Sequence, residues 1–158
     1  MPVVFDATDD AALVTHATAL LRRGATDELE ALVPALTEVA NGEGAHAAEA
    51  AYLLGGIYLV ALDSPELAVE AFEQAGDHPG ALRMLAGLVA EGRGVAQDEL
   101  RATQLYRDAA ERGDMVAQYE LGMRARDHDA AVARRWLEAS AAQGYADAIA
   151  ALREEGDA

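Results

Sequence analysis

Histidine and carboxylate side chains are the groups of this chain that could act in catalysis or bind a metal ion. The four histidines lie on separate segments, at His16, His46, His78 and His128. The one compact metal-like cluster is Asp127-His128-Asp129. Aspartate is also a preferred residue for capping the N-terminus of a helix. We therefore interpret this cluster as a capped turn between two helices and predict no metal site.

The sequence motifs of familiar catalytic and nucleotide-binding sites are missing. There is no H-E-x-x-H, no G-x-S-x-G and no P-loop, and Gly92-x-Gly94 is not followed by the third glycine of a dinucleotide fingerprint. The absence of cysteine excludes disulfides, a thiol nucleophile and thiolate metal ligands. Carboxylates are abundant, but their spacing selects no acid–base pair. We predict a protein that is not an enzyme and binds no cofactor.

The carboxylates do form one pattern that suits binding. An acidic stripe recurs at helical spacing within residues 63–77, at Asp63, Glu66, Glu70, Glu73 and Asp77. We expect no arginine to relieve the repulsion between these like charges, because residues 24–82 contain no base. Such a stripe could receive a basic partner and speed the encounter. The alternative interpretation is a solvated outer face in a generally acidic protein.

The charge of the whole chain excludes one class of partner. Its 158 residues include 28 acidic and 12 basic side chains, for a formal charge of −16. A nucleic-acid-binding protein needs a positive field to displace counterions from phosphate, so none is predicted as a partner. All bases are arginine and 38 residues are alanine. We interpret this composition as that of a GC-rich, bacterial genome, and the length as that of a single domain, 1–158.

The elements that position these side chains are predicted to be helices. Glycine and capping residues separate segments of ordinary helix length that are rich in alanine, leucine, glutamate and arginine. Apolar residues recur at i, i+3, i+4 and i+7, as in Ala102, Leu105, Tyr106 and Ala109. No stretch alternates as a strand would. The fold class is all-α.

Internal repeats organise these helices. The pattern Ala-x3-Leu recurs at Ala50, Ala81, Ala117 and Ala148, and a second helix follows each of the first three copies. Small residues suit positions where backbones meet, and large ones fill the gaps between helices. The predicted fillers are Leu54, Tyr58, Phe72, Leu85, Tyr106, Leu121 and Trp136. Units that bury little alone stabilise one another as a short solenoid.

The repeats resemble those of a known family. The loop 91–98 (EGRGVAQD) is similar to the G-x-G-V-x-x-D connection of Sel1-like repeats, and residues 105–113 (LYRDAAERG) to their W-Y-x-x-A-A-x-x-G ending. The unit 48–80 resembles the related tetratricopeptide repeat. The resemblance covers residues 45–155 and implies a right-handed α-solenoid of antiparallel helix pairs, with about 8–9 helices. Residues 1–44 are predicted to be a divergent helix pair, with Pro34 kinking or splitting its second helix.

The resemblance also implies where a partner would bind. First helices of such repeats line a concave groove, and the positions that face it here fall near Glu49, Tyr52, Arg83, Gly87, Glu91, Tyr119, Met123, Arg126 and Asp127. The predicted partner-binding residues among them are Tyr52, Arg83, Glu91, Tyr119, Met123 and Arg126. For Tyr52 and Tyr119, burial in the core is an equally favoured alternative. The implied role is that of a non-catalytic adaptor, scaffold or chaperone that binds a peptide, helix or domain of another protein. The alternative is an acidic immunity or antitoxin-type inhibitor that neutralises a basic effector protein.

The sequence also bears on location. The N-terminus lacks the positive region of a secretory signal. The longest apolar run, residues 52–62, is well short of the roughly 20 residues that a spanning helix needs. We predict a cytoplasmic protein that does not interact with membranes. The oligomeric state stays open, because short solenoids often cover an apolar end by pairing.

Overall fold

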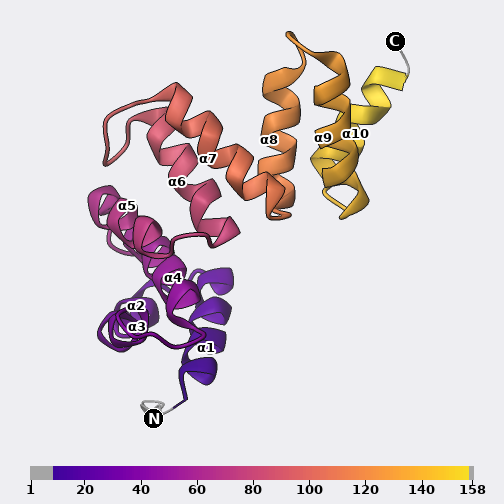
Figure 1. Ribbon diagram of the computed structural model, residues 1–158. Coiled ribbons are helices and arrows are strands. Elements are labelled where there is room, and N and C mark those ends of the chain that lie inside the picture. Colours follow the sequence, from indigo (N-terminus) through magenta and orange to yellow (C-terminus); the bar gives the residue numbers. More distant parts are fainter. Residues whose placement is uncertain (1–8, 157–158) are drawn as a thin grey trace.

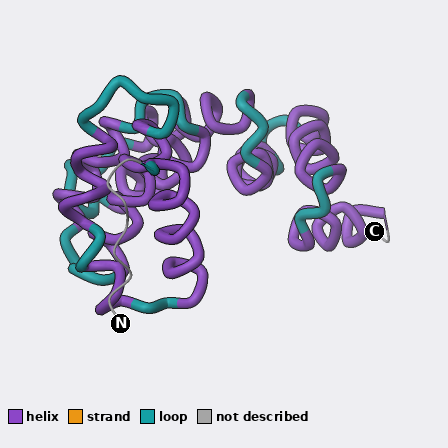
Figure 2. The backbone as a smooth tube through the Cα atoms, turned by 90° about the horizontal axis from the view of Figure 1, so that it is seen from below, coloured by secondary structure: helices purple, strands orange, loops and turns teal. Residues whose placement is uncertain are grey.

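A computed structural model describes residues 9–156 of the chain, with side chains up to residue 154. Within that range it contains ten helices and no strand (Figure 1), so the all-α prediction is confirmed. The helices are α1 Asp10–Arg23, α2 Thr26–Glu30, α3 Val33–Ala40, α4 Ala47–Val60, α5 Pro65–Gln74, α6 Pro79–Glu91, α7 Glu99–Glu111, α8 Met115–Ala125, α9 Ala130–Ala142 and α10 Ala146–Gly156. Loops between them are mostly short turns, as Figure 2 shows.

Aspartates set where the later helices begin. The carboxylates of Asp98, Asp114 and Asp129 precede α7, α8 and α9, and each accepts the backbone N–H three residues further on, at 3.0, 2.8 and 3.0 Å. These bonds satisfy donors that have no partner inside the helix. The capped-turn interpretation of Asp127-His128-Asp129 is confirmed for Asp129.

The N-terminal segment contains more helices than the predicted pair. Pro34 lies in the first turn of α3, where its missing N–H costs nothing, so residues 26–40 form two short helices instead of one. The predicted split at Pro34 is confirmed, and it brings the total above the expected 8–9. Residues 1–8 of the segment predicted as a divergent pair lie outside the described residues.

The remaining helices stack as pairs along an arc. Helix α4 packs on α5, α6 on α7 and α8 on α9, and α10 closes the series against α9. Figure 1 shows α1–α5 at one end of the arc and α8–α10 at the other. Helices α4, α6 and α8 line what we call the inner face. No helix within residues 9–156 is long and apolar enough to cross a membrane.

Glycine permits the close approach of helices within two of the pairs. A Cβ on Gly55 would lie 2.3 Å from the Phe72 ring, and one on Gly122 would lie 2.7 Å from Leu137 Cγ. Large side chains predicted to fill the gaps between helices pack where these glycines allow two helices to approach. Five of the fillers are buried, namely Leu54, Phe72, Leu85, Tyr106 and Leu121. Tyr58 and Trp136 are half-buried against the core, and Arg135 lies 5.0 Å from the Trp136 ring centroid.

The loop between α6 and α7 rests on the preceding helix pair. Gly92 and Gly94 both have positive φ, at 65° and 73°. A Cβ on Gly94 would lie 2.5 Å from the carbonyl carbon of Pro65, at the start of α5. The spacing of these glycines therefore has a packing reason, since only glycine tolerates both the conformation and the contact. The loop joins α4–α5 to α6–α7.

Candidate functional site

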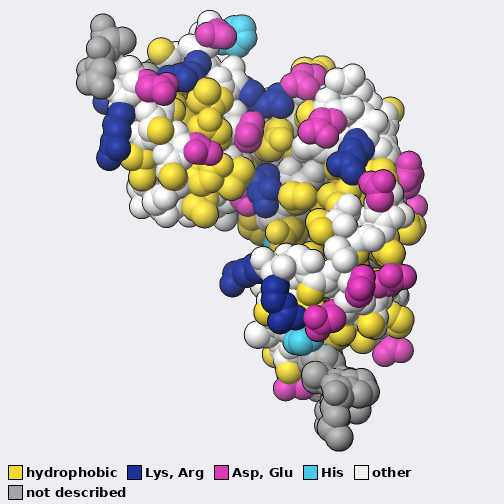
Figure 3. All heavy atoms as spheres, turned by 180° about the vertical axis from the view of Figure 1, so that it is seen from behind, with side chains coloured by type: hydrophobic (Ala, Val, Ile, Leu, Met, Phe, Trp, Pro, Cys, Tyr) yellow, Lys and Arg dark blue, Asp and Glu magenta, His cyan; other side chains and the backbone are white. Residues whose placement is uncertain are grey.

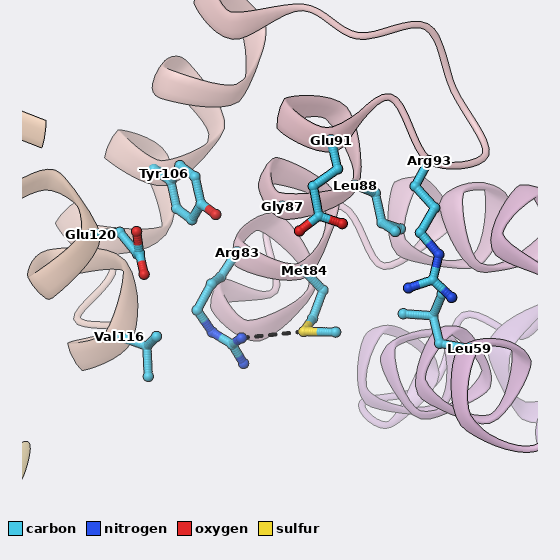
Figure 4. Close-up of a pocket in the computed structure, with 10 residues that line it drawn as sticks. All are labelled: Leu59, Arg83, Met84, Gly87, Leu88, Glu91, Arg93, Tyr106, Val116 and Glu120. Carbon is cyan, nitrogen blue, oxygen red and sulfur yellow. Dashed lines mark hydrogen bonds between the residues drawn. The ribbon is translucent and has the colours of Figure 1, made fainter.

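An open hollow of about 250 Å³ lies on the inner face, between α4, α6, α7 and α8 (Figure 4). Its apolar wall comes from three successive pairs and consists of Leu59, Met84, Gly87, Leu88 and Val116. Its polar groups are Arg83, Glu91, Arg93, Tyr106 and Glu120. An apolar wall with a few converging polar groups is the usual composition of a binding site.

Tyr106 contributes a hydroxyl group to this hollow. The residue is only 8% exposed, and Arg124 lies over its ring at 5.0 Å from the centroid. A Cβ on Gly87 would lie 3.6 Å from the hydroxyl oxygen, so the bare backbone of α6 leaves that oxygen room. Figure 4 shows the hydroxyl directed toward Gly87 on α6. Its oxygen has no hydrogen-bond partner among the described residues and is open to solvent, because Arg124 Nε is the only buried side-chain nitrogen or oxygen atom that lacks a partner there.

The ionisation of Tyr106 is suppressed. Burial of the ring raises the pKa of its phenol above the ordinary value of 10.0, and the Glu120 carboxylate adds to this effect. Glu91 acts in the same direction, whereas Arg124 and Arg83 oppose it. The group therefore stays protonated at neutral pH and can both donate and accept a hydrogen bond.

The arginines of the hollow are already paired, and its carboxylates are not. Arg83 Nε donates to Asp114 Oδ2 at 3.2 Å, and its Nη1 lies 3.2 Å from Met84 Sδ (Figure 4). Arg93 pairs with Asp63 at 3.4 Å. Glu91 and Glu120 make no ion pair with any described residue. The unmatched charge at the hollow is negative.

The acidic stripe on α5 is largely matched by arginines from the next helix pair. Besides Asp63, Glu73 pairs with Arg101 at 2.7 Å and Asp77 with Arg112 at 2.9 Å. The expectation that no arginine neutralises the stripe holds only within its own segment. Its two remaining members, Glu66 and Glu70, are exposed without an ion pair to any described residue. Figure 3 shows acidic side chains along the outer edge of the arc.

One solved structure is similar to this chain in both sequence and fold. Neither models of protein families nor curated proteins match the sequence. Among solved structures, a Sel1 repeat protein from Oxalobacter formigenes is similar, at 29% identity and a TM-score of 0.67. The match covers 77% of this chain and 97% of that one. The chain therefore has the fold of a Sel1-like repeat protein. The predicted family resemblance is confirmed.

The structure does not gather all predicted groove residues in one place. Arg83 and Glu91 line the hollow. Tyr52 is half-buried on α4, where its ring stacks on that of His78 at 4.5 Å between centroids and tilts against Phe72 at 6.2 Å. His78 in turn contacts Glu49 at 2.7 Å. Tyr52 therefore belongs largely to the packing between α4, α5 and α6.

The three groove residues predicted on α8 form a separate group. Tyr119 is half-buried and meets Tyr145 edge-to-face, at 5.3 Å between centroids. Met123 packs against the small core around Leu137, and its sulfur lies 3.7 Å from Arg126 Nη1. None of the three lines the hollow. Their part in binding stays a prediction.

Most of the hollow was not predicted from the sequence, and the polar residues Tyr106 and Glu120 are the most informative of those missed. Tyr106 matched a core position, and its ring is indeed buried, but the pattern carries no information about the direction of its hydroxyl. Glu120 lies on α8 beside Tyr119 and within one turn of Val116. The sequence feature that points to the hollow is Gly87, because a glycine on the inner face of α6 has no side chain and leaves space beside the Tyr106 hydroxyl.

Proposed function

We propose that this chain is a non-catalytic interaction module, an adaptor, scaffold or chaperone, whose inner face binds a segment of another protein. The observation that carries the proposal is the hollow at Tyr106. A hydroxyl group at a buried ring, unpartnered and opening into an apolar-walled cavity, is a group that a ligand can satisfy. Similarity to a Sel1 repeat protein supports the coarser assignment as a protein-interaction module.

The lining groups suit binding better than catalysis. A nucleophile or general base needs a neighbour that activates it. Here the phenol of Tyr106 has a raised pKa, the opposite of activation. Arg83 and Arg93 are held in ion pairs with Asp114 and Asp63. What the hollow offers a ligand is hydrogen bonding, negative charge and apolar contact.

The proposal is tested by blocking the inner face. We expect Gly87→Trp to fill the hollow, because a Cβ there meets nothing closer than 3.6 Å. The matched control is Gln104→Trp, at an exposed position of α7 that does not line the hollow. Proteins captured from lysate by the wild type and the control, and lost only with Gly87→Trp, would support inner-face binding. Equal capture by all three would contradict it.

A second candidate function follows from the exposed carboxylates of α5. Glu66 and Glu70 could bind a basic effector protein, as an immunity or antitoxin-type inhibitor would. Here Glu66→Arg with Glu70→Arg should abolish partner capture that Gly87→Trp leaves intact. Capture should also fall steeply as salt rises, because exposed charges are screened. A cytoplasmic location in a bacterial cell is part of both proposals.

A further inference from the structure

We propose that the hollow on the inner face binds the basic side chain of a partner segment, lysine or arginine, with the charged head between Glu91 and Glu120 at the Tyr106 hydroxyl. This inference rests on the proposed function and names the chemistry that the same site recognises. Three observations carry it: an apolar wall, an unmatched pair of carboxylates, and an unpartnered hydroxyl on a residue that is more than nine-tenths buried.

The wall of the hollow suits the aliphatic stem of a basic side chain. Leu59, Met84, Leu88 and Val116 line it, while Gly87 adds no side chain. Lysine and arginine bury their methylene stems against apolar surface while the charged head keeps polar contacts. The volume of about 250 Å³ falls below the roughly 300 Å³ at which small-molecule sites usually begin. One long side chain is therefore a better occupant than a cofactor-sized ligand.

The charges select a cation over an anion. The arginines facing the hollow are Arg83 on α6, paired with Asp114, and Arg93 in the following loop, paired with Asp63. Helix α4 contributes only Leu59. An anion would have to displace one of these pairs and approach both unpaired carboxylates. A cation approaches two carboxylates that have no ion pair among the described residues, and it displaces neither arginine pair.

The Tyr106 hydroxyl supplies a third contact. Because the phenol stays protonated, its oxygen can accept an N–H of the incoming head while its proton goes to a carboxylate. Figure 4 shows the hydroxyl on the same side of α6 as the carboxylate of Glu91, with Glu120 on the facing helix α8. An ammonium and a guanidinium head both offer several donors to this set. Lysine and arginine are therefore the two sources of the same ligand chemistry.

The probe is a series of blocked peptides, Ac-Gly-Ala-Xaa-Ala-Gly-amide, titrated into the full chain labelled with ¹⁵N. Xaa is lysine or arginine, or their uncharged counterparts norleucine and citrulline. At about 20 mM salt, where screening is weak, we expect lysine or arginine peptides to shift the amides of residues 83–91 and 116–120 saturably. The uncharged peptides should bind about tenfold more weakly. Equal binding of charged and uncharged peptides would overturn the proposal.

Matched variants separate the hollow from the general acidity of the chain. Glu91→Gln with Glu120→Gln should weaken the basic peptides about tenfold. Glu43→Gln with Glu111→Gln removes the same charge from exposed positions outside both the hollow and the acidic stripe and should leave their affinity unchanged. Tyr106→Phe keeps the ring under Arg124 and should weaken binding about threefold with unchanged circular dichroism. An equal loss in both double variants, or none in either, would contradict the inference.

The two proposals can fail separately. Gly87→Trp could abolish partner capture while charged and uncharged peptides bind equally well. In that case inner-face binding is supported, and the inference that the hollow binds a basic side chain is wrong. If basic peptides bind the hollow while Gly87→Trp still captures every partner, the hollow recognises cations but does not serve the proposed function.

Discussion

The two ends of the arc are both built from antiparallel helices, but they differ in thickness. Helix α4 is covered by α1, α2 and α3 as well as by α5 and α6. Helix α8 has substantial packing only against α7 and α9 among the described helices. One hydrophobic cluster runs from Leu13 to Ala102, whereas the cluster at the C-terminal end has three buried members among the described residues, Leu137, Ala148 and Ala151.

This difference shows that a repeat pattern does not distribute stability evenly. Each pair of a solenoid contacts only its neighbours, so the additional helices at one end add burial that the other end lacks. The charged residues are also distributed unevenly between the two ends. Acidic residues dominate the thick end, and arginines of the next pair reach back to Asp63, Glu73 and Asp77. The middle pair, α6–α7, therefore connects the two ends by packing and by charge.

The largest effect is expected from truncating the best-packed filler. Phe72→Ala removes a ring that is 1% exposed and seated against Gly55. We expect it to lower the free energy of unfolding by about 3–5 kcal/mol. Trp136→Ala at the thin end should cost less, because that ring is only half-buried. Urea unfolding followed by circular dichroism measures both, and a larger cost at Trp136 would break the comparison between the ends.

Gly94→Ala tests the connection between the first and second helix pairs. The substitution places a Cβ at positive φ and against the Pro65 carbonyl group. Left-handed conformation and overpacking together should cost about 2–4 kcal/mol. Hydrogen exchange should show faster opening of α5 and α7, while α9 and α10 change little. Uniform acceleration along the chain would instead mean that the arc unfolds as a single unit.

A pair of glycine substitutions should act in opposite directions. Gly55→Ala drives a Cβ into the buried Phe72 ring and should destabilise the chain by about 1–3 kcal/mol. Gly87→Ala meets only the Tyr106 hydroxyl at 3.6 Å and should stabilise α6 by about 0.5–1 kcal/mol, the helix-propensity gain of alanine. The midpoint of thermal unfolding, compared with that of the wild type, should fall for Gly55→Ala and rise for Gly87→Ala. Destabilisation by both would show that the inner face at Gly87 is tightly packed.

The smallest effect is expected from the ion pairs between helix pairs. The Glu73 and Arg101 side chains are 48% and 40% exposed, so Arg101→Gln should cost no more than about 0.2–1 kcal/mol. The cost should shrink at about 1 M salt, where the pair is screened. Leu100→Gln, at a side chain that is 86% exposed, is the neighbouring control. A cost at Arg101 that does not depend on salt would show that its role is packing.

Local patterns in the sequence were enough to predict most of the fold. The Ala-x3-Leu repeat located the first helix of each pair, Pro34 marked the break before α3, and Asp129 marked the start of α9. These signals act within one or two turns of helix. The hollow and the ion pairs could not be predicted, because they depend on residues about one repeat apart. The direction of the Tyr106 hydroxyl and the reach of Arg101 to Glu73 emerge only when the pairs stack.

The position of Trp136 gives the thin end an optical signature of its own. It is the only tryptophan of the chain, and it lies half-buried in α9 beneath Arg135. Because Trp136 packs against the buried cluster of α6, α7 and α8, its emission reports on the contact between α9 and that cluster, while far-ultraviolet dichroism averages over all ten described helices. A red shift that precedes the loss of ellipticity on heating would mark the thin end coming apart first, without any attached dye.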